Sequence, residues 1–225
     1  MNQKLTIYSV LLLLLILGLG GCKDMGGEEK EENIMEMSVE ELPDVTAFRD
    51  EFTREFMIST EPIKEGYYLF QSKTGGYTMM YPENARLDNL YYESPSDGYE
   101  AIQYTENVEE KEYEYVVRVT YNHGERANNL EELKVLMESR TNYNGEYETI
   151  DSEDKIINYA TTDSVSRKGG RISYQFLGII QSPKNNQSLS YNYNIVTHTE
   201  NNIDLDNIEE EVLEMIESVE FRNTK

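Results

Sequence analysis

The most reactive side chain in this sequence is the thiol of Cys22, the only cysteine among 225 residues. It directly follows Gly20 and Gly21, which come after an apolar stretch from Leu5 to Leu19. A deprotonated cysteine sulfur is a strong nucleophile, and flanking glycines let the backbone enter a narrow enzyme cleft. The residue types and their order therefore predict covalent modification at Cys22. A single cysteine also excludes an internal disulfide.

The segment before Cys22 is typical of an export signal. Lys4 gives a positive start, the apolar stretch follows, and small residues precede the cysteine. Leu5 to Gly21 contains 17 residues, at the short edge of the roughly 17 to 25 residues that a membrane-spanning helix needs. Glycines weaken its end as a helix. We therefore expect residues 1–21 to be a cleaved signal peptide rather than a transmembrane helix.

The tetrapeptide Leu19-Gly20-Gly21-Cys22 resembles the lipobox of bacterial lipoproteins. In that family the cysteine sulfur receives a diacylglyceryl group, and the peptide bond before it is cut. Two fatty chains such as palmitate, at roughly 0.8 kcal/mol per buried methylene, hold a protein stably on a membrane. The resemblance implies lipidation at Cys22 and a place on the extracytoplasmic face of the cell membrane. The alternative is an ordinary secretory signal followed by an ordinary thiol.

Other residues that could do chemistry are sparse. The two histidines, His123 and His198, do not have the spacing of a zinc site, and no phosphate-binding, dinucleotide-binding or serine-nucleophile motif occurs. His198 and Glu200 lie two apart on an expected strand end, which would allow an acid/base pair. His123 to Arg126 is typical of a turn between a strand and a helix. We predict no catalytic residue, no metal ligand and no cofactor.

A short acidic segment offers oxygen ligands of the kind that calcium prefers. The glycine of the EF-hand loop is missing, and Asp206 and Glu209 are explained as helix-cap residues. Weak calcium binding remains an alternative to capping. The residues concerned are Asp204, Asp206, Asn207, Glu209, Glu210 and Glu211.

The charge of the chain limits its partners. It has 43 acidic and 20 basic side chains, a net charge of −23, so phosphate backbones and anionic headgroups repel it. Nucleic acid is excluded as a partner, whereas cations and basic partners are attracted. Residues 22–44 are rich in glutamate and contain Gly26-Gly27. We expect this segment to be an acidic flexible tether.

Residues 45–225 have the length of one folded domain. Phenylalanines spaced by four predict a first helix, and two capping patterns, at Asn129 and at Asp206, open two more. Alternating apolar residues predict strands joined by glycine and proline turns. The expected helices are 47–57, 129–140 and 206–219, and the expected strands are 67–71, 77–81, 90–93, 99–105, 112–121, 155–164, 171–181 and 188–199. This order predicts a single α+β domain, a mostly antiparallel sheet flanked by helices.

Three segments of this domain resemble the PsbP/Mog1-like superfamily, which includes bacterial lipoproteins. They are Gly76 to Asn84, the helix from Leu130, and Met215 to Phe221. The chain departs from many members at Ala85-Arg86, where an aromatic residue is common. Because the superfamily covers unrelated roles, the resemblance implies the fold and not the function.

Tyrosine is the dominant large residue, with 18 copies and no tryptophan. Amphipathic rings on a surface make contacts with glycans or proteins, although core filling accounts for most of them. The candidates for an outward face are Tyr67, Tyr68, Tyr91, Tyr92, Tyr113 and Tyr115.

We therefore expect a non-enzymatic, membrane-anchored interaction module of the cell envelope. Its partner would be an envelope protein or a cell-wall polymer. One alternative is an envelope hydrolase, or another enzyme that uses carboxylates, which a concave pocket with converging acids would favour. A flat or tyrosine-lined surface would favour binding. A solute-binding lipoprotein is the third alternative, although one domain lacks the two lobes that usually close around a solute.

Overall fold

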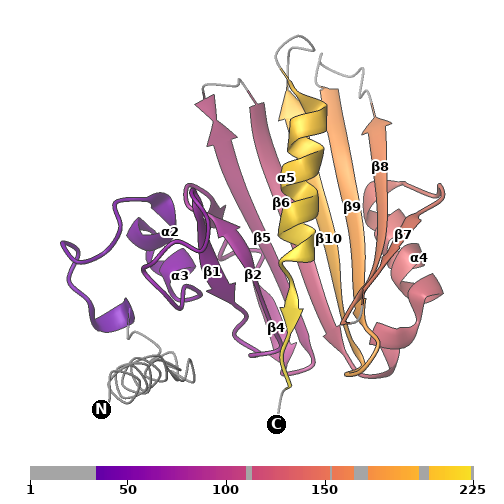
Figure 1. The fold of residues 1–225 in the computed structure, drawn as a ribbon, viewed down its shortest axis with the longest axis horizontal. Helices are drawn as coiled ribbons and strands as arrows, with labels where there is room; N and C mark the ends of the chain where they lie inside the picture. Colours follow the sequence, from indigo (N-terminus) through magenta and orange to yellow (C-terminus); the bar gives the residue numbers. More distant parts are fainter. Residues whose placement is uncertain (1–33, 110–112, 153, 165–171, 198–202, 224–225) are drawn as a thin grey trace, which may run out of the picture. The chain divides into compact units, whose positions relative to one another are not determined.

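An eight-stranded antiparallel sheet forms the centre of the structure, a computed structural model that describes residues 34–109, 113–152, 154–164, 172–197 and 203–223 (Figure 1). Its strand order is β3-β5-β6-β10-β9-β8-β7, and β4 pairs with β5 outside this path. The strands are β3 Arg86–Leu87, β4 Glu93–Ser96, β5 Tyr99–Val108, β6 Tyr113–His123, β7 Glu148–Asp151, β8 Ile156–Ser164, β9 Ile172–Ser182 and β10 Gln187–Thr197.

A smaller three-stranded sheet has the order β1-β2-β11. It contains β1 Tyr67–Gln71, β2 Tyr77–Pro82 and β11 Glu220–Phe221. The β1–β2 hairpin is confirmed, and its turn includes Gly75 at φ 69°, a conformation that glycine adopts without strain. Gln187 of β10 joins the two sheets, because its side-chain amide donates to the carbonyl oxygens of Gly76 and Arg222 at 3.2 and 2.9 Å.

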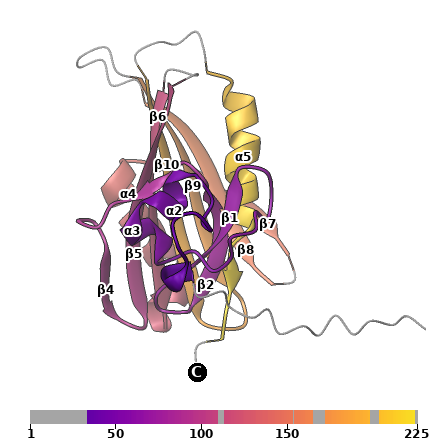
Figure 2. The same ribbon diagram turned by 90° about the vertical axis from the view of Figure 1, so that its left-hand side faces the viewer.

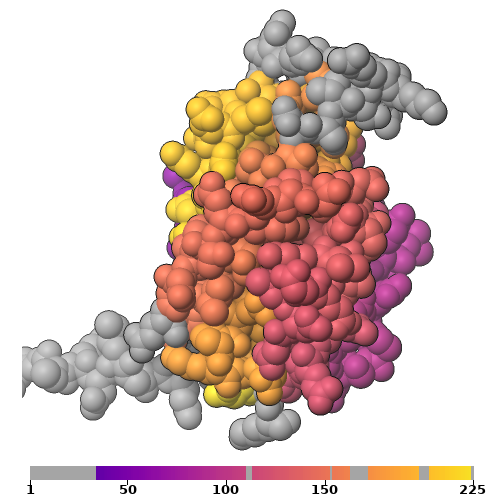
Figure 3. Space-filling view, turned by 90° about the vertical axis from the view of Figure 1, so that its right-hand side faces the viewer, coloured from indigo at the N-terminus to yellow at the C-terminus, as the bar shows by residue number. Residues whose placement is uncertain are grey.

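Two helices, α4 (Leu130–Thr141) and α5 (Leu205–Glu217), lie on opposite faces of the large sheet (Figure 2). Alternation along β9 explains the arrangement. Phe176 and Ile180 belong to the main core with α5, whereas Leu177 and Ile179 pack with Leu133 and Met137 of α4. The chain from α4 to β8 makes up much of the face seen in Figure 3. The predicted α+β class is confirmed.

The strand β6 has the predicted alternation. It pairs with β5 on one side and β10 on the other, so it is central in the sheet. Its odd-numbered side chains from Tyr113 to Tyr121 are buried, and Glu114 and Arg118 are exposed. The predicted helix cap is confirmed as well, since the Asn129 side chain accepts a hydrogen bond from the Glu132 amide at 3.2 Å.

The predicted helix 47–57 is wrong as a single element. The structure has α2 (Thr46–Arg49) and α3 (Glu51–Arg54), with Asp50 extended between them at φ −79°, ψ 118°. The Asp50 carboxylate accepts hydrogen bonds from the amide and the hydroxyl of Thr53 at 2.9 and 2.7 Å. This local bonding competes with a continuous helix and begins a new one.

Two further boundaries differ from the sequence prediction. The strand expected at 90–93 is β4, which lies at 93–96 instead. Its turn to β5 is at Asp97-Gly98, and Pro95 is tolerated because β4 is an edge strand. The cap of α5 is Asp204 rather than Asp206, and its carboxylate accepts from the Asn207 amide at 3.2 Å. The short strands β3, β7 and β11 were not predicted, since two to four residues carry no periodic signal.

The folded part begins before the predicted boundary at residue 45. Ile34, in a short 3-10 helix (Ile34–Glu36), and Leu42 are 3% and 9% exposed and belong to the main core. Burial of these apolar side chains outweighs the acidic composition around them. Cys22 and residues 23–33 lie outside the described residues, as does the predicted signal peptide. In the described part of the chain, no helix is both long and apolar enough to cross a membrane.

Candidate functional site

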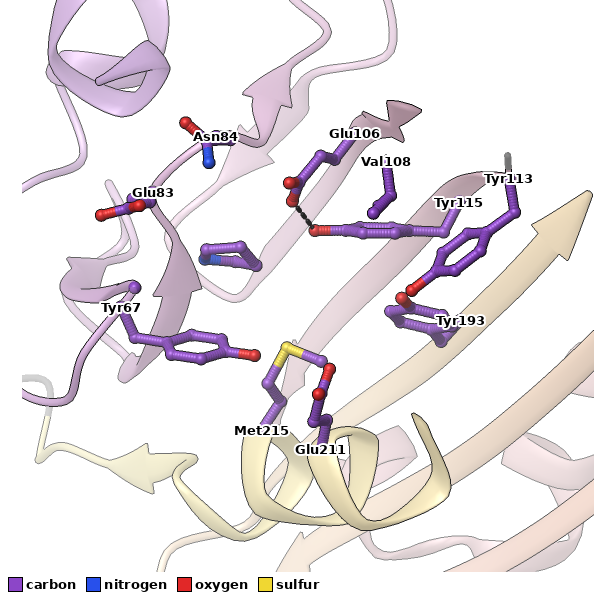
Figure 4. A pocket seen from close by; sticks show the side chains of 12 residues that line it. Tyr67, Glu83, Asn84, Glu106, Val108, Tyr113, Tyr115, Tyr193, Glu211 and Met215 are labelled. Carbon is purple, nitrogen blue, oxygen red and sulfur yellow. Dashed lines mark hydrogen bonds between the residues drawn. The ribbon is translucent and has the colours of Figure 1, made fainter. Parts of the chain in front are cut away.

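A cavity of about 220 Å³ lies where the two sheets and α5 meet (Figure 4). Four tyrosine rings and three glutamate carboxylates dominate its lining, and we call it the tyrosine–glutamate pocket. The lining residues are Gly66, Tyr67, Pro82, Glu83, Asn84, Glu106, Val108, Tyr113, Tyr115, Tyr193, Glu211 and Met215.

Strand alternation positions the rings at the back of the pocket. Tyr113 and Tyr115 are two residues apart on β6 and share one face of the sheet. Tyr193 on the neighbouring β10 stacks on Tyr115, with ring centroids 4.6 Å apart and an angle of 25° between the planes. Such an offset pair adds about 0.5–1.5 kcal/mol to the burial of the rings. Tyr115 and Tyr193 therefore support each other at this side of the pocket.

Strand register brings a carboxylate to these rings. Glu106 on β5 is directly opposite Tyr115 on β6, and the Tyr115 hydroxyl donates a hydrogen bond to the Glu106 carboxylate (Figure 4). Burial and the Glu106 charge raise the pKa of Tyr115 well above its usual value. Tyr115 is therefore a neutral hydrogen-bond donor at physiological pH.

The helix α5 supplies the opposite side of the pocket. Glu211 and Met215 are one turn apart and project from the same face. The Glu211 carboxylate is oriented by the side-chain amide of Asn207, which donates to it at 2.8 Å. Tyr67 of β1 points toward both residues (Figure 4).

The negative charges of the pocket carboxylates raise the pKa values of the pocket tyrosines. Burial, and after it the charges of Glu211 and Glu106, raise the pKa of Tyr67 to about 12. The same causes in the same order raise the pKa of Tyr113 to about 12. Two phenols on different sheets therefore experience the same pair of negative charges.

Two tyrosines of the pocket are almost fully buried. Tyr113 and Tyr193 are 5% and 4% exposed, and both line the cavity. None of the described lining residues carries a positive charge. The pocket therefore offers phenol groups and acids to a ligand.

The residues singled out in the sequence are mostly elsewhere. Cys22, His198 and Glu200 lie outside the described residues. His123 is exposed at the end of β6 remote from Tyr113, and the predicted turn follows it. Of the acidic segment considered for calcium, only Glu211 lines the pocket. Across the described ranges, no group of three or more His, Cys, Asp or Glu side chains could hold a metal ion.

The tyrosines considered for an outward face have a different arrangement. Tyr68, Tyr113 and Tyr115 are buried, and Tyr91 is exposed. Tyr67, Tyr113 and Tyr115 line the pocket instead. Glu106 is a pocket residue that the sequence pattern does not reveal, because its position depends on the pairing of β5 with β6. Tyr193 lies on the predicted face of its strand, and the structure adds that it lines the pocket.

Comparisons with known proteins agree on one family. The family model YvcA_Mog1p, described as "Putative lipoprotein YvcA", matches residues 43–220. The protein of that name from Bacillus subtilis (strain 168) is 28% identical over 236 residues, covering 97% of each chain. Both matches are described as a lipoprotein.

Two solved structures are similar at lower identity. A mutant of the protein Mog1 has a TM-score of 0.45 and 13% identity, covering 70% of this chain and 97% of the other. A crystal structure from Bacteroides thetaiotaomicron VPI-5482 has a TM-score of 0.44 and 11% identity, covering 71% of this chain. This chain spans half the length of that second structure. On the family match over residues 43–220, the chain belongs to the YvcA_Mog1p family of lipoproteins.

Proposed function

We propose that this protein is a lipid-anchored binding module on the extracytoplasmic face of the cell membrane, which holds a small ligand in the tyrosine–glutamate pocket. The observation that carries the binding role is the pocket itself. Rings, phenol hydroxyls and carboxylates from both sheets and α5 converge on one cavity of about 220 Å³. A concave site with a few convergent polar groups is the usual form of a small-molecule site.

The anchor rests on Leu19-Gly20-Gly21-Cys22 and on the lipoprotein description of the family. Export would leave Cys22 as the first residue, with a diacylglyceryl thioether on its sulfur. The residues from Cys22 to the first described residue, Ile34, would then link the lipid to the folded domain.

The described lining residues favour binding over chemistry. They supply acids and phenols, but no histidine, cysteine, serine, threonine or lysine. The phenols with raised pKa values are weak acids and stay protonated at neutral pH. Such groups position a ligand through hydrogen bonds and ring contacts.

A carboxylate-based hydrolase is the second candidate, because Glu106 and Glu211 line the same cavity. Glycosidases use two carboxylates across a scissile bond. The Glu106 carboxylate is, however, bonded to the Tyr115 hydroxyl, and Glu211 to Asn207. Release of a chromophore from aryl glycosides or aryl esters by the purified protein, abolished by Glu211→Gln, would favour this candidate.

Replacement of Cys22 by serine tests the anchor. Serine lacks the thiol that carries the lipid, so we expect Cys22→Ser protein to leave the membrane fraction under a high-salt wash. Gly26→Ala, which leaves the Leu19–Cys22 tetrapeptide intact, serves as the control and should stay with the membrane. Retention of the Cys22→Ser protein at the level of the control would contradict the proposal.

A further inference from the structure

We propose that Asn144 is a site of spontaneous covalent modification, at which the side-chain amide is lost as ammonia and a carboxylate takes its place. Asparagine is among the chemically labile residues of proteins. The reaction needs no enzyme, and water is its only co-reactant. The tyrosine–glutamate pocket and the lipid anchor play no part in it.

The reactive pair lies in the loop that joins α4 to β7, where Gly145 directly follows Asn144 (Figure 1). Both residues are exposed and lie outside the helices and strands. No other asparagine in the sequence precedes a glycine. Glycine has no side chain to shield its backbone nitrogen, so this nitrogen can reach the carbonyl carbon of the preceding side chain. Exposed loop tips are also where the backbone moves most freely.

Neither reacting group is held by a hydrogen bond. In the described part of the chain, the Gly145 amide and the Asn144 side chain bond to no other residue. The residues on either side are fixed, because the Tyr143 amide donates to the Thr141 hydroxyl at 3.2 Å and the Tyr143 hydroxyl donates to the Glu146 carbonyl. The second of these hydrogen bonds spans the reactive pair without engaging it.

Packing explains why glycine occupies position 145. A β-carbon on Gly145 would lie 2.6 Å from the hydroxyl oxygen of Tyr143 and 2.7 Å from its Cζ, too close for a normal contact. The Tyr143 ring packs edge-to-face on Tyr147, with ring centroids 5.3 Å apart. Both rings also pack against the buried cluster that contains Leu133 and Met137 of α4. The contact that requires glycine at position 145 therefore also creates the reactive pair.

The reaction has two steps. In the first step the Gly145 nitrogen bonds to Cγ of Asn144, the bond from Cγ to Nδ2 breaks, and Nδ2 leaves as ammonia with the proton of the Gly145 amide. A five-membered succinimide ring remains. In the second step one water molecule adds to either ring carbonyl and breaks its bond to the Gly145 nitrogen, which regains a proton. Opening at Cγ gives aspartate, and opening at the main-chain carbonyl gives isoaspartate.

The two products change the loop differently. Both add a negative charge, and aspartate leaves the main chain as it was. Isoaspartate routes the main chain through Cγ and lengthens it by one methylene, within the span that the Tyr143–Glu146 hydrogen bond closes. Opening to isoaspartate therefore disturbs the loop, whereas opening to aspartate changes only its charge.

Peptide mapping by mass spectrometry tests the proposal in the full-length protein, purified in a neutral detergent and incubated in water labelled with heavy oxygen. Trypsin cleaves after Arg140 and after Lys155. The resulting peptide contains Asn144 and an internal control, Asn142, which is also exposed but precedes the bulky Tyr143. Asn144 should take up the label at least about tenfold faster than Asn142, because only glycine leaves the attacking nitrogen unshielded.

The same protein unfolded in urea provides the reference for the effect of the fold. The proposal requires that the folded loop permits ring closure, so labelled Asn144 should accumulate in the folded protein as well. An unlabelled Asn144 in the folded protein, at the time when the unfolded protein has converted completely, would overturn the proposal. Equal labelling of Asn142 and Asn144 in the folded protein would overturn it too.

Two variants show whether the label enters through the succinimide. Asn144→Gln keeps the amide, but its ring closure would need a six-membered ring, so this variant should lose the label at position 144. Asn89→Gln makes the same change at another exposed loop asparagine, which precedes Leu90, and should leave labelling at Asn144 unchanged. Isoaspartyl methyltransferase, which methylates isoaspartate and not aspartate, should modify the aged protein and the aged Asn89→Gln variant. Persistent labelling of Asn144→Gln at that position, or no isoaspartate in the aged protein, would contradict the ring mechanism.

Discussion

The ring of Tyr121 lies against the α-carbon of Gly76, so closely that a β-carbon on Gly76 would be 2.3 Å from its Cζ and hydroxyl oxygen. Gly76 lies between the turn and β2, and Tyr121 is a buried residue of β6. The Tyr121 hydroxyl accepts a hydrogen bond from Gln187, which also bonds to the carbonyl of Gly76. The Gly76–Tyr121 contact and the two Gln187 hydrogen bonds therefore join the small sheet to the large sheet.

Replacement of Gly76 by alanine should destabilise the protein. The ring cannot retreat without loss of the Gln187 bond, so the methyl group should cost about 1–3 kcal/mol of the free energy of unfolding. Gly98→Ala is the control, since its β-carbon would meet the His123 carbonyl at an ordinary 3.6 Å. Urea denaturation followed by circular dichroism measures both. Equal stability of the two variants would show that the contact is not rigid.

A second glycine permits the close approach of α5 to the sheet. A β-carbon on Gly178 would lie 2.9 Å from Cδ1 of Ile216, the flexible end of that side chain. Because that methyl group can move aside, Gly178→Ala should destabilise the protein by no more than about 1 kcal/mol, less than Gly76→Ala. Ile216→Val removes Cδ1, so the double variant should recover part of that loss. Denaturation of the unmodified protein, the two single variants and the double variant measures the four free energies of unfolding. Strict additivity would mean that the two residues do not interact.

Local sequence signals predict some elements of this fold and miss others. The strand β6 and the Asn129 cap were predicted because period-two burial and a capping pattern are local signals. The break at Asp50 was missed, because the Asp50–Thr53 hydrogen bonds compete with an equally local helical pattern. The meeting of Glu106 with Tyr115 depends on the pairing of two strands, which no local pattern encodes.

The hydroxyl pair of Tyr104 and Tyr191 should behave as a unit. The oxygens are 2.6 Å apart in the core, and the Tyr191 hydroxyl also contacts the sulfur of Met215 at 3.6 Å. Tyr191→Phe leaves the Tyr104 hydroxyl buried and unpaired, and should cost about 1–3 kcal/mol. The double phenylalanine variant should cost less than the sum of the single variants. A double-mutant cycle by thermal unfolding that gave simple additivity would refute the pairing.

A buried carboxyl, Glu100, should make stability depend on pH. The residue is 0% exposed, and burial raises its pKa above the usual value, although the Lys73 amide donates to it at 2.9 Å. In the unfolded chain the carboxyl ionises at its ordinary pKa of 4.5. Between pH 4.5 and the higher pKa of the folded state, Glu100 ionises more readily in the unfolded chain. The free energy of unfolding therefore falls as pH rises through this range, and above it the contribution of Glu100 is constant.

Replacement of Glu100 by glutamine isolates this effect. Glutamine has the same shape and no charge, so Glu100→Gln should gain stability relative to the unmodified protein as pH rises from about 4 to 7. Glu93→Gln, at an exposed carboxyl on β4, provides the matched control and should show no such gain. Denaturant midpoints across that pH range measure both. A gain for Glu100→Gln that is independent of pH would contradict the assignment.

The proposed membrane location depends on one covalent bond at Cys22. Mass spectrometry of the N-terminal peptide from native membranes tests that bond most directly. The account predicts a chain that begins at Cys22 and carries a diacylglyceryl thioether on the sulfur. A bare cysteine at that position, or residues upstream of it still attached, would contradict the account.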